Sequence, residues 1–165
     1  MINKIETQKY IINRLDNYIE SSQNKSNLYL ALNTIILGGV ITLISTKVDS
    51  LSCILNLLLG AISILSLISI IQTLRAINPY LKKSLNKTKS IFFFKDIAEC
   101  SIKDYQESVL EKSKKGLIQD LAGQSHILAK GLTNKYNILM ISGWLIGLEF
   151  FLLFCWIIIF LTQKN

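Results

Sequence analysis

The chain has 165 residues, half of them hydrophobic, and its 18 basic and 11 acidic side chains give a formal net charge of +7. One Pro and eight Gly favour a helical chain. At this length there is room for one unit, and three membrane-length apolar segments leave no large polar core for a separate catalytic domain.

Residues 1–27 are polar, but apolar side chains recur in them at helical spacing, at Ile5, Ile12, Leu15 and Ile19. This pattern predicts an amphipathic N-terminal helix. Such a helix lies on the membrane surface or packs on another polar segment. Packing is favoured here because basic and acidic residues are mixed, whereas surface helices are usually basic on one side.

Residues 28–74 contain two uncharged apolar runs, 28–46 with 19 residues and 53–74 with 22. About 20 apolar residues at 1.5 Å each cross a bilayer core of roughly 30 Å, so each run is long enough to span a membrane. The six residues between them suffice only for a tight turn. These features predict a transmembrane helical hairpin; a very apolar soluble bundle is disfavoured because no face of either helix is charged.

Residues 75–136 form the one long polar segment, with twelve basic residues and six acids. Pro79 marks the end of the second apolar helix or a kink beyond it. A helix is expected from near Lys95, with one face formed by Ala98, Ile102, Tyr105 and Val109. After a break at residues 114–116 the stripe resumes at Leu117, Leu121, Leu128 and Leu132. Two such helices, packed against the N-terminal helix, predict a small helical bundle.

Residues 137–165 contain the third apolar run, 138–161, with Tyr136 and Trp156 near its ends as expected of interfacial aromatics. Basic residues number four in 1–27, one in the hairpin turn, twelve in 75–136 and one in the tail. The positive-inside rule therefore places the N terminus and the middle segment in the cytosol, and the hairpin turn and C terminus outside.

The predicted fold is an all-α membrane protein with four segments. They are a cytosolic N-terminal helix (1–27), a transmembrane hairpin (28–74), a small cytosolic helical bundle that would sense a ligand (75–136), and a C-terminal transmembrane helix with its tail (137–165). Three spans with the N terminus inside fit a multi-pass protein of the bacterial inner membrane.

Catalytic motifs are missing from the sequence. His126 is the single histidine, the three cysteines are far apart, and no phosphate loop, metal-ligand motif or nucleophile elbow is present. We therefore expect no enzyme activity, no metal and no cofactor. Orientation in the membrane accounts for most of the basic charge, so nucleic-acid binding is not indicated, while an anionic small ligand stays possible.

Three polar details depart from this pattern. Gln124 interrupts an apolar stripe and should face the bundle interior or a ligand. Glu149 lies in the middle of an apolar run, where an acid suggests a pore, a polar partner, a trigger, or a protonated packing role. Gly143 and Gly147 form a pair that allows close helix approach. At 100° per residue Glu149 and Gly147 address different neighbours, which suits a homo-oligomer.

Four short motifs lie next to the apolar runs or in the polar segment between them. They are Asn24-Lys25-Ser26, Arg75 with Pro79, Phe93-Phe94 to Tyr105, and Asp120-Leu121, Gln124 and Lys135-Tyr136. With them the chain resembles, over residues 24–161, the transmembrane effectors of the bacterial Pycsar antiphage system. The resemblance implies that a partner cyclase senses phage and makes a cyclic pyrimidine mononucleotide, cCMP or cUMP. The effector would bind it and then impair the inner membrane, causing abortive infection.

The resemblance and the polar details together give the candidate residues. Those expected to bind the ligand are Lys25, Arg75, Tyr105, Asp120, Gln124, Lys135 and Tyr136, and those expected to act in the membrane are Gly143, Gly147 and Glu149. The expected partners are lipid, the cyclic nucleotide and further copies of the chain. Two other functions stay open: a ligand-independent scaffold or partner-binding protein, and a holin-like pore that kills when expressed alone.

Overall fold

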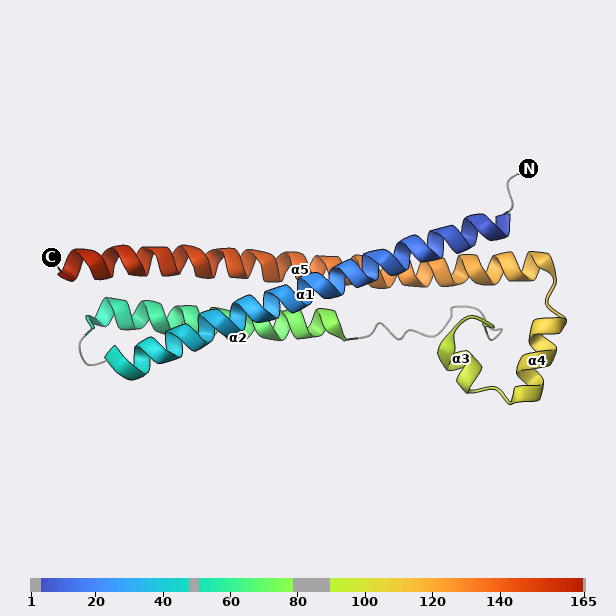
Figure 1. Ribbon diagram of the computed structural model, residues 1–165, viewed down its shortest axis with the longest axis horizontal. Helices are drawn as coiled ribbons and strands as arrows, with labels where there is room; N and C mark the ends of the chain where they lie inside the picture. The colour runs from blue at the N-terminus through green and yellow to red at the C-terminus, as the bar shows by residue number, and fades with distance from the viewer. Residues whose placement is uncertain (1–3, 48–50, 79–89, 165) are drawn as a thin grey trace. The chain divides into compact units, whose positions relative to one another are not determined.

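The computed structural model describes residues 4–47, 51–78 and 90–164, and in that part of the chain it contains helices and no strand (Figure 1). The helices are α1 (Lys4–Lys47), α2 (Cys53–Ile77), α3 (Phe94–Ala98), α4 (Ile102–Leu110) and α5 (Lys114–Lys164). By length and composition, α1, α2 and α5 can each cross a membrane. The expectations of an all-helical chain and of three apolar spans are confirmed.

The chain divides into two compact units. Unit 1 comprises residues 1–21 and 79–134, and unit 2 comprises residues 22–78 and 135–165. The long helices α1 and α5 each contribute residues to both units, whereas α2 belongs to unit 2 and the short helices α3 and α4 to unit 1.

In unit 2, α2 buries one face in a regular pattern of three- and four-residue steps, at Leu55, Leu59, Ile62, Ser66, Ser69, Thr73 and Ala76. The mean step of 3.5 residues is that of helices packed as in a coiled coil. Residues from α1 and α5 complete the interior, and its apolar core consists of Ile36, Val40, Leu55, Leu59, Ile62 and Trp156.

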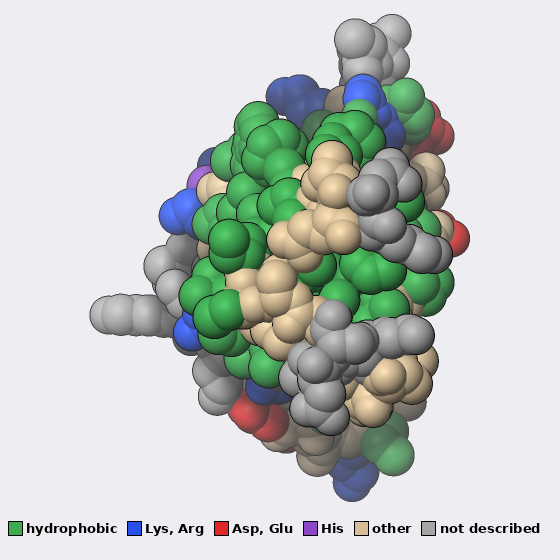
Figure 2. All heavy atoms as spheres, turned by 90° about the vertical axis from the view of Figure 1, so that its left-hand side faces the viewer, with side chains coloured by type: hydrophobic (Ala, Val, Ile, Leu, Met, Phe, Trp, Pro, Cys, Tyr) green, Lys and Arg blue, Asp and Glu red, His purple; other side chains and the backbone are tan. Residues whose placement is uncertain are grey.

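The outer surface of unit 2 is apolar, while part of its interior is polar. Leu57, Ile64 and Trp144 are 70%, 61% and 77% exposed, yet Asn33 and Glu149 are fully buried. Figure 2 looks onto the end of unit 2 that carries the C-terminal end of α5, and hydrophobic side chains cover most of the visible described surface. A soluble bundle places its polar side chains outside, so this distribution suits lipid rather than water.

The expectation that Trp156 is an interfacial aromatic is wrong. Its side chain is 7% exposed, lies in the core of unit 2 and stacks on Phe160 with ring centroids 5.1 Å apart. The reason is helical register: Ser142, Glu149 and Trp156 follow one another at seven-residue intervals and therefore share the inward face of α5.

In unit 1 the N-terminal part of α1 packs on α5. Ile5, Ile12, Leu15 and Ile19 are half-buried, as the apolar stripe predicts. The Ser125 hydroxyl on α5 donates a hydrogen bond to Gln8 Oε1 on α1, 3.4 Å away. Packing of this helix on the polar segment is thus confirmed.

A long helix from Lys95 does not form. The first helix of this segment, α3, ends at Ala98, and a new helix, α4, begins at Ile102 because the Ser101 hydroxyl accepts a hydrogen bond from the Asp104 N–H at 3.2 Å. None of the described residues of α4 is buried, and Ile102 is 78% exposed. The predicted inward face at Ala98, Ile102 and Val109 is therefore wrong, and only Tyr105 is half-buried.

The predicted helix break is also misplaced. Residues 114–116, where the break was expected, form the first turn of α5, and the chain is non-helical at residues 111–113 instead. The Ser113 hydroxyl accepts a hydrogen bond from the Gly116 N–H at 3.1 Å, so this serine fixes the start of the helix. Pro79 lies outside the described residues, and α2 ends at Ile77.

Candidate functional site

A network of hydrogen bonds in unit 1 holds residues 90–92 against α3 and α5. The Ser90 N–H donates to Asp96 Oδ2 at 2.8 Å. The Ser90 hydroxyl accepts from the Gln124 side-chain amide at 2.9 Å and from the Phe92 N–H at 3.1 Å. Gln124 is thus buried and faces the interior of unit 1, as its place in the stripe predicted.

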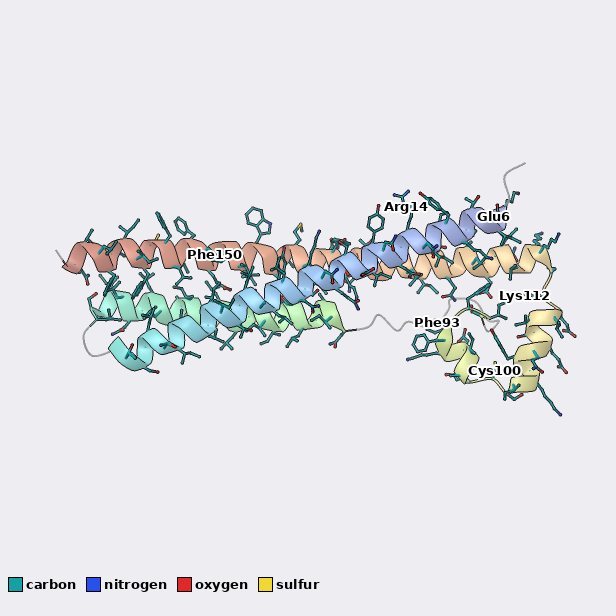
Figure 3. All side chains as sticks on the ribbon, viewed as in Figure 1. Glu6, Arg14, Phe93, Cys100, Lys112 and Phe150 are labelled. Carbon is teal, nitrogen blue, oxygen red and sulfur yellow. The ribbon has the colours of Figure 1, made fainter. Side chains whose placement is uncertain are left out.

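Both backbone polar groups of Ile91 are hydrogen-bonded. Its N–H donates to Asp120 Oδ2 at 3.0 Å, and its carbonyl accepts from the Tyr105 hydroxyl at 3.3 Å. Lys112 Nζ donates to the same Asp120 oxygen at 2.6 Å. We call the whole set the Ser90 network: Ser90, Ile91, Asp96, Tyr105, Lys112, Asp120 and Gln124. Figure 3 labels Lys112 in the stretch that joins α4 to α5, and Phe93 and Cys100 at the two ends of α3.

The electrostatics of the network keep Asp120 ionised. Partial burial opposes ionisation, but hydrogen bonds from Lys112 and from the Ile91 N–H outweigh it and lower the pKa of the Asp120 carboxyl. At neutral pH the network therefore contains a carboxylate that only accepts hydrogen bonds, next to a lysine that only donates them. Such a pair can exchange partners with an anionic ligand.

The structure brings three of the seven expected ligand residues together, namely Tyr105, Asp120 and Gln124. The other four belong to unit 2. There the ammonium of Lys25 lies over the ring of Tyr136, 5.2 Å from its centroid. Lys135 is half-buried beside Tyr136 in sequence, and Arg75 is exposed in the last turn of α2.

Glu149 lies in the interior of unit 2 with no exposed surface. Neither of its carboxyl oxygens has a hydrogen-bond partner among the described residues. The Ser66 hydroxyl of α2 lies near the carboxyl group, but the two do not reach hydrogen-bond geometry. A buried acid without a partner is costly, so Glu149 stays a functional candidate.

Asn33 is buried in the same interior. Its side-chain amide donates to the Tyr29 carbonyl at 2.8 Å and to the Ser69 hydroxyl at 3.1 Å, which ties α1 to α2. Its own carbonyl oxygen, Oδ1, has no partner among the described residues. Unit 2 therefore holds several buried oxygen atoms that are able to accept hydrogen bonds and do not.

The two glycines of the predicted pair have different surroundings. A Cβ on Gly143 would lie 3.0 Å from the Tyr29 hydroxyl, so Gly143 allows α1 to approach α5 within the chain. A Cβ on Gly147 would meet no described atom within 4 Å, and Gly147 is exposed. Gly147 and Glu149 therefore lie on different sides of α5, one exposed and one buried, while a neighbour for Gly147 stays a prediction.

Several residues of these sites were not predicted. In unit 1 they are Ser90, Asp96 and Lys112, for which the sequence offers no local signal because their partners are distant or lie in loops. In unit 2 they are Asn33, Ser66, Ser69 and Ser142. These four had a usable signal: each is a polar residue in an apolar run, and Ser66, Ser69 and Thr73 recur at helical spacing.

Comparisons with known proteins match most of the chain. The family model PycTM, described as the Pycsar effector protein domain, matches residues 7–163. Pycsar effector protein EcPycTM of Escherichia coli is 33% identical over 140 residues, which cover 76% of this chain and 74% of that protein. No solved structure matches the chain.

Proposed function

Because the chain belongs to the Pycsar effector protein domain family, whose members are transmembrane effectors of antiphage defence, we propose that it senses a cyclic pyrimidine mononucleotide and impairs the bacterial inner membrane. Pycsar effectors are activated by cyclic nucleotides that a cyclase makes. The proposed ligand is cCMP or cUMP, and the proposed outcome is abortive infection. The chain acts as a membrane effector and not as an enzyme.

The observation that carries the membrane part is the reversed polarity of unit 2. Its outer side chains, such as Leu57, Ile64 and Trp144, are apolar and exposed, whereas Glu149 and Asn33 are buried. In lipid this exposure costs nothing, and the polar interior is kept away from the hydrocarbon. Unit 2 is therefore the membrane part of the effector.

The orientation follows from the basic residues. The segment 75–136 carries twelve of them, and the positive-inside rule assigns it to the cytosol together with the N terminus. Unit 1, which contains most of this segment, thus faces the compartment in which the nucleotide is made. The hairpin turn and the C terminus lie outside.

Ligand sensing is assigned to unit 1, with the Ser90 network as its centre. A nucleotide phosphate needs a cationic donor, which Lys112 offers, and a pyrimidine base needs amide-like donors and acceptors, which Gln124 offers. Tyr105 supplies a ring for stacking. Each of these groups now has an internal partner, so a ligand phosphate would compete with Asp120 for Lys112.

The remaining candidates in unit 2, Lys25, Arg75, Lys135 and Tyr136, stay candidate ligand contacts. Three are cationic and one is aromatic, which is the chemistry of phosphate and base recognition. A ligand acts only through different affinities for two states of the protein. Because α5 runs from Lys114 to Lys164 without a break, it connects any change around Gln124 or Lys135 to Glu149.

Self-association is assigned to the outward face of α5. Gly147 is exposed and has open space around it, which lets a helix of a second copy approach closely. Gly143 does not serve this contact, because Tyr29 of the same chain occupies its surroundings. A homo-oligomer in lipid is the proposed assembly.

The proposed function is tested in cells that carry the chain with an active or an inactivated pyrimidine cyclase. After phage infection, only cells with the active cyclase should lose their membrane potential, read with a potential-sensitive dye. Depolarisation with the inactivated cyclase would support a holin-like pore instead. No depolarisation with either cyclase would support a ligand-independent scaffold.

Single substitutions then separate sensing from membrane action. Lys112→Ala should weaken nucleotide binding by about tenfold or more if the ligand binds in unit 1, and Lys135→Ala should do so if it binds in unit 2, since a charge-assisted hydrogen bond contributes about 1.5–3 kcal/mol. The exposed Lys130→Ala is the matched control. Glu149→Gln should leave binding unchanged in calorimetry and alter depolarisation. If Lys130→Ala weakens binding as much as the other two, the assigned contacts are wrong.

A further inference from the structure

The interior of unit 2 consists of two parts with different chemistry. The polar half contains Asn33, Ser66, Ser69, Thr73, Ser142 and Glu149. The apolar half contains Ile36, Val40, Leu55, Leu59, Ile62 and Trp156. On α2 the two halves meet between Ile62 and Ser66, which are successive inward residues of one helix face.

The polar half holds more acceptors than donors. Both Glu149 carboxyl oxygens, Asn33 Oδ1 and the Ser66 hydroxyl oxygen lack hydrogen-bond partners among the described residues, and all three side chains are fully buried. Buried polar groups in proteins are almost always partnered by protein, water or an ion. The polar half is thus built to hold water or a cation between α1, α2 and α5.

The charge of the polar half selects the ion. Glu149 is the one acid among the described residues of unit 2, so a single negative charge is available. One carboxylate balances one monovalent cation, whereas Ca²⁺ and Mg²⁺ usually take more carboxylates or a phosphate. Carboxyl, amide and hydroxyl oxygens are hard ligands that do not favour soft metals. An anion such as Cl⁻ is repelled.

The apolar half closes the interior. Leu55, Leu59 and Ile62 are at most 1% exposed and pack with Val40 and Trp156. Hydrophobic constrictions of this kind block ions because they exclude water, and they conduct once they are wetted.

From this arrangement we propose that unit 2 carries a path for monovalent cations inside each chain, with Glu149 and Asn33 as its cation-binding layer and the apolar half as its gate. The inference rests on the proposed membrane-effector function. In the closed state the apolar half keeps the helices packed, while the unpartnered oxygens of the polar half favour the entrance of water. A ligand needs only to shift this balance.

The gate is tested with full-length protein in vesicles of phosphatidylethanolamine and phosphatidylglycerol loaded with KCl. Without nucleotide, Ile62→Ser and Leu59→Ser should release K⁺ at least about tenfold faster than wild type, because a small polar residue removes core packing from the closed state. The matched controls are Ile64→Ser and Leu57→Ser on the outer face of α2, at positions 61% and 70% exposed. The controls should release K⁺ at the wild-type rate.

The ion selectivity is tested in the same vesicles with K⁺ and Cl⁻ electrodes and with trapped carboxyfluorescein. Ile62→Ser vesicles should release K⁺ in strong preference to Cl⁻ and retain the dye. The double variant Ile62→Ser with Glu149→Gln should show a K⁺ to Cl⁻ release ratio about tenfold lower than Ile62→Ser alone. The double variant Ile62→Ser with Glu149→Asp, which keeps the carboxylate, should retain most of the ratio. The circular dichroism spectrum of each reconstituted variant checks that the helices are kept.

Two results would overturn the cation path. One is equal K⁺ release by the inward and outward variants of α2, and the other is a K⁺ to Cl⁻ ratio that does not depend on Glu149. The failure of the proposed function has a different signature. In that case cCMP and cUMP have no effect on wild-type vesicles while Ile62→Ser still conducts K⁺ and Ile64→Ser does not.

Discussion

Unit 1 and unit 2 both bury polar side chains, but only those of unit 1 are fully engaged. In unit 1 the buried Asp96 and Gln124 each bond to Ser90. In unit 2 the buried Glu149 and the Asn33 carbonyl oxygen have no partner among the described residues. Partnered polar groups fix one conformation, whereas unpartnered ones raise the free energy of the state that buries them. Unit 1 is therefore organised to hold residues 90–92 in place. Unit 2 is organised to change from its packed state to another state, in which its buried polar groups gain partners.

The largest expected effect concerns the side of the membrane on which unit 1 and the C-terminal end of unit 2 lie. In a chain whose native cysteines are replaced, Glu107→Cys on the exposed face of α4 should be protected from an impermeant thiol reagent in intact cells. Thr162→Cys, near the end of α5, should react fully. Permeabilised cells, in which both positions must react, provide the control. Labelling of Glu107→Cys in intact cells would place unit 1 outside and reverse the comparison.

A smaller effect tests the partnered groups of unit 1. Asp96→Ala leaves the buried Ser90 N–H without its acceptor and should destabilise unit 1 by about 1–3 kcal/mol. Faster hydrogen exchange of the Ser90 and Phe92 amides would report the loss. The exposed Glu107→Ala should change stability by less than about 0.5 kcal/mol. A negligible effect of Asp96→Ala would show that the network does not hold residues 90–92.

Replacement of the unpartnered acid of unit 2, Glu149, should not destabilise the protein, in contrast to Asp96→Ala in unit 1. Glu149→Leu removes a buried carboxyl that makes no hydrogen bond. The free energy of unfolding, measured by thermal unfolding in detergent, should therefore be unchanged or higher by about 1 kcal/mol. Its counterpart in unit 1, Gln124→Leu, removes one of the two hydrogen bonds that the Ser90 hydroxyl accepts and should cost about 0.5–1.5 kcal/mol. A loss from Glu149→Leu as large as that from Gln124→Leu would erase the distinction between the units.

The smallest effect is a pH dependence in unit 1. Because its hydrogen bonds lower the pKa of Asp120 in the folded protein, Asp120 stabilises unit 1 above its unfolded pKa of about 3.9. That contribution is lost as the pH falls through the lower pKa of the folded state. Thermal unfolding should therefore show a dependence below about pH 4 that Asp120→Asn lacks. An identical pH profile for both proteins would show that the ion pair between Asp120 and Lys112 does not stabilise unit 1.

The sequence predicts the three apolar spans because an uncharged run of about 20 residues has few alternatives. It also predicts that Gln124 faces the interior of unit 1, because helical periodicity fixes the face of each residue, whereas for Glu149 it leaves several roles open. The starts of α4 and α5 were missed although Ser101 and Ser113 are ordinary N-cap residues. The cap at Ser101 was missed because the apolar stripe from Ala98 to Val109 continues across it and predicted one unbroken helix.

The contacts within the two sites could not be predicted from spacing. Gln124 and Ser90 are 34 residues apart in sequence, and Asn33 and Ser69 are 36 apart. Periodicity assigns a residue to a face of its own helix, but it does not determine which residue of another segment lies opposite. That pairing depends on the register between helices and on the position of residues 90–92, which only the three-dimensional structure provides.

The single acid of the apolar run 138–161 also has a consequence for the biogenesis of the proposed membrane part. Synthesis proceeds from the N terminus, so the uncharged runs of α1 and α2 enter the bilayer before α5 is complete. Glu149 then adds about 2.5–3.5 kcal/mol to the insertion of its helix, which the many Leu, Ile and Phe residues of 138–161 offset at about 0.3–0.6 kcal/mol each. We expect α5 to insert by itself and then to dock on a hairpin already in place, which removes the Glu149 carboxyl group from the lipid.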